Sequence, residues 1–116
     1  MGGSLVKAVG AGTVMQVLMV VADHLLPDTQ AWLFPIGGTL IGFITGWLAG
    51  HGTLGSAGAR ATNGGIAGGV AGALGSLVST ALGDVPLGNI AIAGGSTLVA
   101  GAIGGVLSRM LGAKAV

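Results

Sequence analysis

The sequence predicts an all-α membrane protein: four transmembrane helices in two hairpins of the same orientation, forming a single integral membrane domain over residues 1–116. Three observations predict this fold. Only 6% of the residues are charged while 52% are hydrophobic, whereas a soluble domain is usually about 25% charged. The few charges fall in gaps between long uncharged runs. The 26 glycines recur at helical spacing, which predicts glycine-zipper packing between the helices.

The charged residues alternate in sign from one gap to the next, in the order Lys7, Asp23 with Asp28, Arg60, Asp84, and Arg109 with Lys114. If each run crosses a bilayer, every Lys and Arg lies on one face and every Asp on the other, with both termini on the basic face. Cytoplasmic loops are enriched in Lys and Arg, so both termini are predicted to be cytoplasmic. The expected markers of topology, in contact with lipid headgroups, are Lys7, Arg60, Arg109 and Lys114.

The first apolar run is the shortest. Ala8–Ala22 is short for a hydrocarbon core of about 30 Å, unless Lys7 snorkels to the interface or the helix is packed inside an assembly. A signal peptide ending near Val20–Ala22 is an alternative interpretation. The later runs are each long enough to cross, and they are Thr29–Gly50, Ala61–Gly83 and Val85–Ser108.

The charge gaps divide the domain into two hairpins. Hairpin 1 is predicted over about residues 5–50 and hairpin 2 over about 64–112, with a flexible Gly- and Ser-containing linker over 51–63. The acidic gaps are predicted to be tight turns. Ile36–Gly42 is similar to Ala93–Gly101 if an insertion is allowed, which indicates an internal duplication with both copies in the same orientation.

Glycines spaced by four residues predict the sites of helix packing. They are Gly38, Gly42, Gly46 and Gly50 in the second run, Gly64, Gly68 and Gly72 in the third, and Gly101 and Gly105 in the fourth. Helix association in a bilayer depends on close van der Waals approach, which small residues permit. Packing inside the bundle explains any one row. Because three runs carry such rows and a small bundle has a limited interior, we also expect contacts between copies of the chain.

A few polar and aromatic residues have individual interpretations. Trp32 and Trp47 lie near opposite ends of the second run and are predicted to be membrane-interface anchors. Gln16 is an amide in the middle of the first run, and an interhelical hydrogen bond is favoured over the lining of a pathway. His51 is expected to complement the negative end of a helix dipole.

The sequence predicts no catalytic constellation, no metal site and no cofactor. His24 beside Asp23 and Asp28 could ligate a metal, but a turn with solvated polar residues explains the grouping better. Asn63–Gly69 lacks the Lys-Ser/Thr of a phosphate loop. A net charge of +1 gives no basic surface for nucleic acid.

The paired glycine-rich hairpins resemble the proteolipid subunits of rotary ATPases. That resemblance implies an ionisable carboxylate near the middle of the membrane. Every Asp of this chain falls in a predicted turn and the sequence contains no Glu, so ion-coupled transport is not expected.

These features favour a non-enzymatic structural subunit that contacts membrane lipids and assembles with copies of itself, as in a virion membrane layer, a pilus or a filament. A holin-like or other pore-forming protein is the first alternative. A channel or accessory subunit of a larger complex, with an unidentified membrane partner, is the second.

Overall fold

The structure, a computed structural model, describes residues 2–26, 28, 32–53 and 55–115, and the side chains of all of these except 2–4, 34 and 109–115. The described residues form helices and the segments that connect them, which confirms the all-α class. The elements are α1 (Gly2–Leu25), the π-helical turn η2 (Leu33–Gly37), α2 (Gly38–His51), α3 (Ala57–Ala81) and α4 (Asn89–Ala115).

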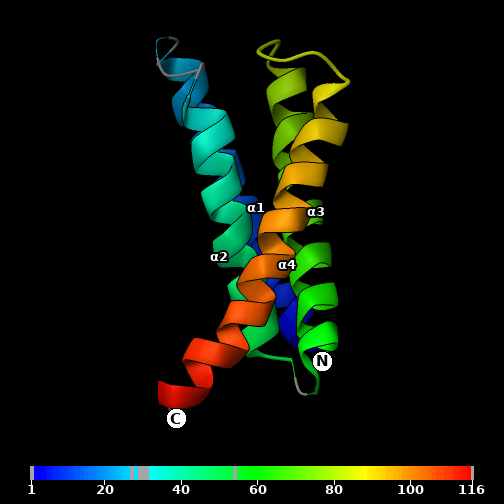
Figure 1. Ribbon diagram of the computed structural model, residues 1–116. Helices are drawn as coiled ribbons and strands as arrows, with labels where there is room; N and C mark the ends of the chain where they lie inside the picture. Colours follow the sequence, from blue (N-terminus) through cyan, green and yellow to red (C-terminus); the bar gives the residue numbers. More distant parts are fainter. Residues whose placement is uncertain (1, 27, 29–31, 54, 116) are drawn as a thin grey trace.

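The helices alternate in direction along a rod of 42 × 22 × 19 Å. α1 and α3 run one way and α2 and α4 the other, so both termini lie at the same end (Figure 1). α2 and α3 each pack against both α1 and α4, whereas α1 and α4 make little direct contact among the described residues. The most extensive contact is between α3 and α4, and α2 has more contact with α4 than with α1.

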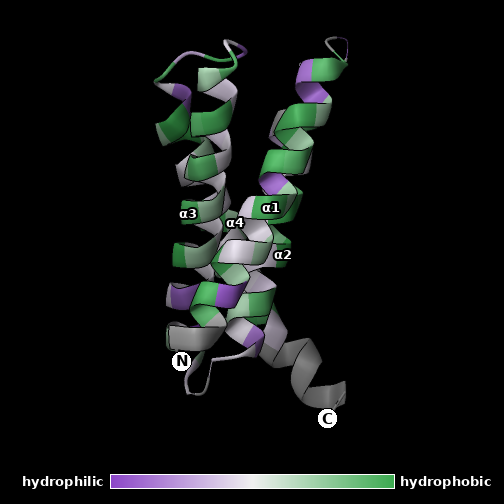
Figure 2. Cartoon of the chain, turned by 180° about the vertical axis from the view of Figure 1, so that it is seen from behind, coloured by the Kyte–Doolittle hydropathy of each residue, from purple (hydrophilic) through white to green (hydrophobic). Residues whose placement is uncertain are grey.

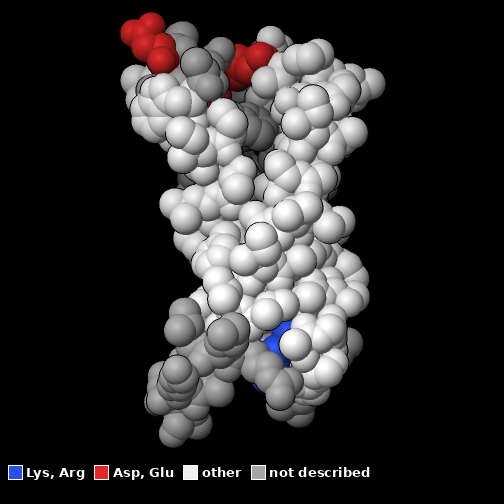
Figure 3. Space-filling model, in the orientation of Figure 1, with Lys and Arg blue, Asp and Glu red and all other residues white. Residues whose placement is uncertain are grey.

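The charges gather by sign at the two ends of the rod. Figure 3 shows the acidic side chains at the end where α1 and α3 finish and basic side chains toward the opposite end. Lys7 lies near the start of α1 and Arg60 in the first turn of α3, while Asp84 lies between α3 and α4. The alternating charges therefore correctly predicted the order of the helix directions.

Three of the described helices are long and apolar enough to cross a membrane: Leu5–Leu25, Ala57–Ala81 and Asn89–Ser108. The predicted shortness of the first run was wrong, because α1 remains helical through Lys7 at one end and through Asp23 at the other. A charged residue ends an apolar run without ending a helix.

In the second run the α-helix is shorter than the apolar run, whereas α1 is longer than its run. α2 begins only at Gly38 and has 14 residues, roughly 21 Å at 1.5 Å per residue. Pro35 lies in the preceding π-helical turn, where its missing N–H interrupts the α-helical bonding pattern. Next to this interruption, the Pro35 carbonyl accepts a hydrogen bond of 2.7 Å from Thr39 Oγ1.

The predicted linker over 51–63 is largely helical. α3 begins at Ala57, where the Ser56 side chain caps the helix by accepting a 3.2 Å hydrogen bond from the Ala59 N–H. Asn63 Nδ2 donates to Thr53 Oγ1 at 3.0 Å. This bond ties the second turn of α3 to the connection, so the flexible segment expected from the sequence is instead a short, anchored one.

Small and polar residues fill the interior, and large aliphatic residues cover the outside. Along η2 and α2 the exposed aliphatic positions recur every four residues, at Ile36, Leu40, Ile44 and Leu48. The fully buried side chains include those of Gln16, Thr45, Thr53, Ser76 and Ser79. Figure 2 shows hydrophobic residues along the whole length of the helices. This distribution is the reverse of that in a soluble protein.

Candidate functional site

The glycine row of α2 lies directly against α4. The facing pairs are Gly42 with Thr97, Gly46 with Gly101, and Gly50 with Gly105. A Cβ atom added to Gly42 would lie 2.9 Å from Thr97 Cβ, and one added to Gly50 would lie 2.6 Å from Gly105 Cα. Side chains do not approach other atoms so closely, so only glycine fits at these positions without a shift of the helices.

The glycine row of α3 reaches the same strip of α4. A Cβ on Gly64 would meet the Gly101 carbonyl, and one on Gly72 would meet the Thr97 side chain. A Cβ on Gly68 would meet the Thr97 carbonyl and would lie 3.1 Å from the carbonyl oxygen of Gly42 on α2. Three backbones therefore converge around Gly101, with α4 between the rows of α2 and α3.

Gly38 has a different environment from the other predicted packing glycines. Its carbonyl accepts a 3.0 Å hydrogen bond from Gln16 Nε2 of α1. All of the predicted packing glycines are buried within the single chain. The rows thus contact one another inside the bundle, which is the interpretation that the sequence favoured for any one row, and contacts between copies stay a prediction.

Some close glycine contacts were not predicted from the sequence, among them those of Gly104 and Gly12. A Cβ on Gly104 would meet the Phe43 carbonyl and would lie 3.0 Å from the Trp47 backbone nitrogen, while one on Gly12 would meet the Thr45 side chain. The double glycine at 104–105 was a usable signal, because adjacent glycines can serve two neighbouring helices. No glycine lies four residues before or after Gly12 in α1, so the sequence gave no such signal there.

Gln16 occupies the junction of α1, α2 and α3. Its side chain is fully buried and bonds to Gly38 on α2, while a Cβ on Gly75 of α3 would lie 2.8 Å from Gln16 Cβ. The predicted interhelical hydrogen bond is confirmed. Gln16 Oε1 is buried and accepts no hydrogen bond from the described residues.

Several buried hydroxyl groups bond to their own helices, whereas those of Thr13, Ser79 and Thr80 have no partner among the described residues. Thr45 Oγ1 donates to the Ile41 carbonyl at 2.7 Å and Thr97 Oγ1 to the Ala93 carbonyl at 2.6 Å. Such bonds satisfy a hydroxyl without water. Ser76 Oγ instead accepts a 3.1 Å bond from Asn89 Nδ2, which joins α3 to α4.

The acidic end differs from the predicted pair of solvated turns. Asp23 lies within α1 and is buried, with 2% of its surface exposed, so the statement that every Asp falls in a turn was wrong. Its spacing from Gln16 and Val20 places all three residues on one face of α1. This spacing is the sequence feature that could have indicated the burial of Asp23. His24 Nδ1 lies 2.9 Å from Asp84 Oδ2 and connects α1 to the α3–α4 turn.

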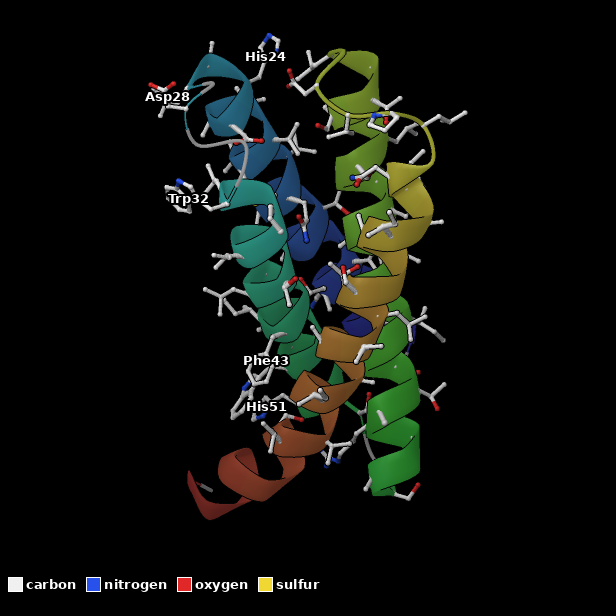
Figure 4. The ribbon with its side chains drawn as sticks, turned by 45° about the horizontal axis from the view of Figure 1, so that its top comes forward. His24, Asp28, Trp32, Phe43 and His51 are labelled. Atoms are coloured by element: carbon white, nitrogen blue, oxygen red, sulfur yellow. The ribbon has the colours of Figure 1, made fainter. Side chains whose placement is uncertain are left out.

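The predicted grouping of His24 with Asp23 and Asp28 does not form a metal site. The described residues contain no group of three His, Cys, Asp or Glu side chains that could hold a metal ion. In Figure 4 the side chains of His24 and Asp28 lie apart. The His24 ring instead contacts the Asp84 carboxyl group, which is far from it in the sequence.

The predicted basic residues have unequal environments. Lys7 is exposed, whereas Arg60 is partly buried and its Nη1 donates to the Gly50 carbonyl at 2.8 Å, at the end of α2. Arg60 therefore stabilises a helix terminus, where a cation is favoured. The side chains of Arg109 and Lys114 lie outside the described residues. His51 is exposed in the last turn of α2, as expected for a residue near the dipole's negative end.

The tryptophans lie at opposite ends of the helical segment formed by η2 and α2. Trp32 immediately precedes η2 and is half exposed, as Figure 4 shows. Trp47 is one turn from the end of α2, and its ring centroid lies 6.4 Å from that of Phe43. Their role as interface anchors stays a prediction.

No family model matches this chain, and neither a curated protein nor a solved structure matches it. The chemistry and geometry of its own residues therefore carry the functional argument.

Proposed function

We propose that this chain is a non-enzymatic integral membrane protein that serves as a structural subunit of a membrane-associated assembly. The observation that carries the proposal is the reversed distribution of residues: large aliphatic side chains are exposed on all four helices, and the interior consists of small and polar ones. In water, such a surface would be an extended apolar patch. In lipid it is the expected exterior, because lipid tails are as apolar as leucine.

All four helices cross the bilayer in this proposal. η2 and α2 together form a continuous helical segment over Leu33–His51, which falls within the range of about 17–25 residues that a crossing requires. The glycine rows then act as a glycine zipper that packs α2 and α3 onto α4. The shared basic end, with both termini, faces the cytoplasm by the preference of Lys and Arg for that side.

The interior favours a structural role over a pore. The backbones of α2, α3 and α4 approach so closely around Gly101 that side chains do not fit between them. Several buried hydroxyls also bond to nearby backbone carbonyls and need no water. A pore between copies would be lined by the outer faces, and these carry aliphatic residues. Aliphatic walls do not hold water as a polar lining does.

Because the glycine rows are occupied within the chain, assembly requires an outer face, and α3 is the best candidate. Its mean hydropathy of 1.3 is below the 1.8 of the other two candidate spans, so it gains the least from contact with lipid. Its exposed aliphatic residues also form a regular row, at Ile66, Val70 and Leu74. A second copy packed on this row would shield α3 from lipid.

The test is the mass of the purified particle in mild detergent, measured by light scattering. We expect a particle of several chains. Val70→Ala with Leu74→Ala should reduce it toward a single chain, while the matched pair Val14→Ala with Leu18→Ala on the exposed face of α1 should leave it unchanged. A single-chain particle at every concentration would contradict the assembly role. Protein-dependent release of a small dye from liposomes would favour the pore instead.

A further inference from the structure

A groove runs between α1 and α2 at the basic end of the molecule. It has a volume of about 260 Å³ and is lined by Lys7, Ala8 and Ala11 of α1 and by Leu48 of α2. This is close to the lower limit of about 300 Å³ for small-molecule pockets. The groove exists because the small side chains of Ala8 and Ala11 leave space beside Leu48. Beneath it, Ala8 packs against Ala49 and Ala67, which close the floor.

Lys7 stands at this groove without a counter-ion. Its side chain is exposed, and it makes no ion pair with the described residues, whose carboxylates belong to the opposite end of the rod (Figure 3). A lysine only two residues inside the candidate span Leu5–Leu25 can extend its ammonium group to the level of the lipid headgroups. The groove thus combines one positive charge at the interface with an apolar channel that leads into the membrane.

We propose that this groove is a binding site for an anionic phospholipid. The Lys7 ammonium pairs with the headgroup phosphate, and the upper part of one acyl chain lies along Ala8, Ala11 and Leu48. The apolar lining continues into the exposed aliphatic surface through Ile44 and Val14, so the rest of the chain remains in contact with apolar side chains. An anionic lipid is favoured over a zwitterionic one because the acidic side chains of the described residues lie at the opposite end of the rod and do not balance a choline or ethanolamine group here.

This inference requires only that the protein is in a membrane and does not depend on assembly between copies. Lipid binding and particle mass are separate measurements, so either proposal can fail while the other stands. The probes are phosphatidylglycerol and phosphatidylcholine, added separately to the purified full chain in detergent, with the bound lipids counted by native mass spectrometry.

We expect phosphatidylglycerol to bind more tightly than phosphatidylcholine. Lys7→Gln should weaken phosphatidylglycerol binding roughly fivefold, from the typical contribution of one cation near an anionic headgroup, and Lys7→Arg should restore it. Added salt should reduce the difference between the two lipids. Phosphatidylcholine binding should be nearly the same for Lys7→Gln and for the unmodified chain.

The apolar half of the site is tested by filling it. Ala11→Leu should reduce the binding of both lipids, because the larger side chain occupies the groove. The matched control is Gly10→Leu, since a side chain at this adjacent position enters open space and should leave binding unchanged. Circular dichroism on each variant confirms that the helices are retained.

Three results would overturn the proposal. The first is equal binding of the two lipids to the unmodified chain. The second is an equal loss for Lys7→Gln and Lys114→Gln, which would indicate an effect of total charge and not of one site. The third is a chain–chain complex that Ala11→Leu dissociates while lipid binding is unaltered, because a second copy would then be the occupant.

Discussion

α4 and α1 each pack against α2 and α3, but through different kinds of contact. α4 meets α2 and α3 through backbone atoms, and a single added carbon at Gly46 or Gly101 would collide with a carbonyl group. α1 meets its neighbours through side chains: Gln16 bonds to Gly38, and Met19 lies against Gly37. The trio of α2, α3 and α4 is therefore specified mainly by missing side chains. α1 is specified mainly by side chains that are present, with the contact of Gly12 and Thr45 as an exception.

This difference in the contacts predicts which helix interfaces tolerate amino-acid substitutions. A backbone cannot move aside without shifting its whole helix, whereas a methionine or glutamine can adopt another rotamer. The interfaces around Gly101 should therefore respond sharply to small substitutions, and those around α1 should respond gradually. Free energies of unfolding in detergent, measured by circular dichroism during titration with a denaturing detergent, can compare the two.

The largest effect is expected for Gly101→Ala. The added methyl group would meet the Gly64 carbonyl and would lie 3.1 Å from Gly68 Cα, so α3 and α4 must separate. We expect a loss of about 3 kcal/mol, at the upper end of the usual cost of overpacking. Gly95→Ala is the matched control on the same helix, because nothing lies within 4 Å of its Cβ position. If the two variants were equally stable, the backbone contact around Gly101 would be absent.

An intermediate effect is expected for Gln16→Met. The substitution keeps the length of the side chain but removes the hydrogen bond to the Gly38 carbonyl. It also removes Oε1, which is buried without a partner among the described residues. The two changes oppose each other, so the net loss should be about 1 kcal/mol. A loss as large as that of Gly101→Ala would show that α1 is held as rigidly as the other helices.

The smallest effect is expected for Gly37→Ala. Its added methyl group would lie 3.0 Å from Met19 Sδ, and the flexible thioether can move away. We expect a change within about 0.5 kcal/mol. Combining it with Met19→Ile, whose branched side chain is stiffer, should increase the cost. If Gly37→Ala alone costs as much as Gln16→Met, α1 is less tolerant than the comparison implies.

The sequence was most informative about the direction of each helix and least informative about which helices contact one another. The charge gaps placed Asp84 in a turn between two helices and separated the basic from the acidic end. They failed for α1, because Lys7 and Asp23 are charged and yet remain helical. Hydropathy records where an apolar run stops, whereas a helix continues as long as its backbone bonds are made.

The glycine rows show a second limit. The predicted packing glycines are all buried, but their spacing did not indicate which helix lies opposite each row. A strip such as Gly42–Gly46–Gly50 accepts any smooth helix face, so its spacing does not distinguish α4 of the same chain from a helix of another copy. Gly104 and the buried Asp23 were missed for a related reason, because each depends on which helix lies opposite.

The separation of charge between the two ends would oppose inversion of the protein in a bilayer. To turn over, the chain would have to carry its aspartates and its basic residues across the hydrocarbon in opposite directions. Each charge at the bilayer centre costs at least about 2.5–3.5 kcal/mol, and the costs add. Whatever orientation the protein has after synthesis would then be permanent, and every copy inserted by the same route would present the same end to the same compartment.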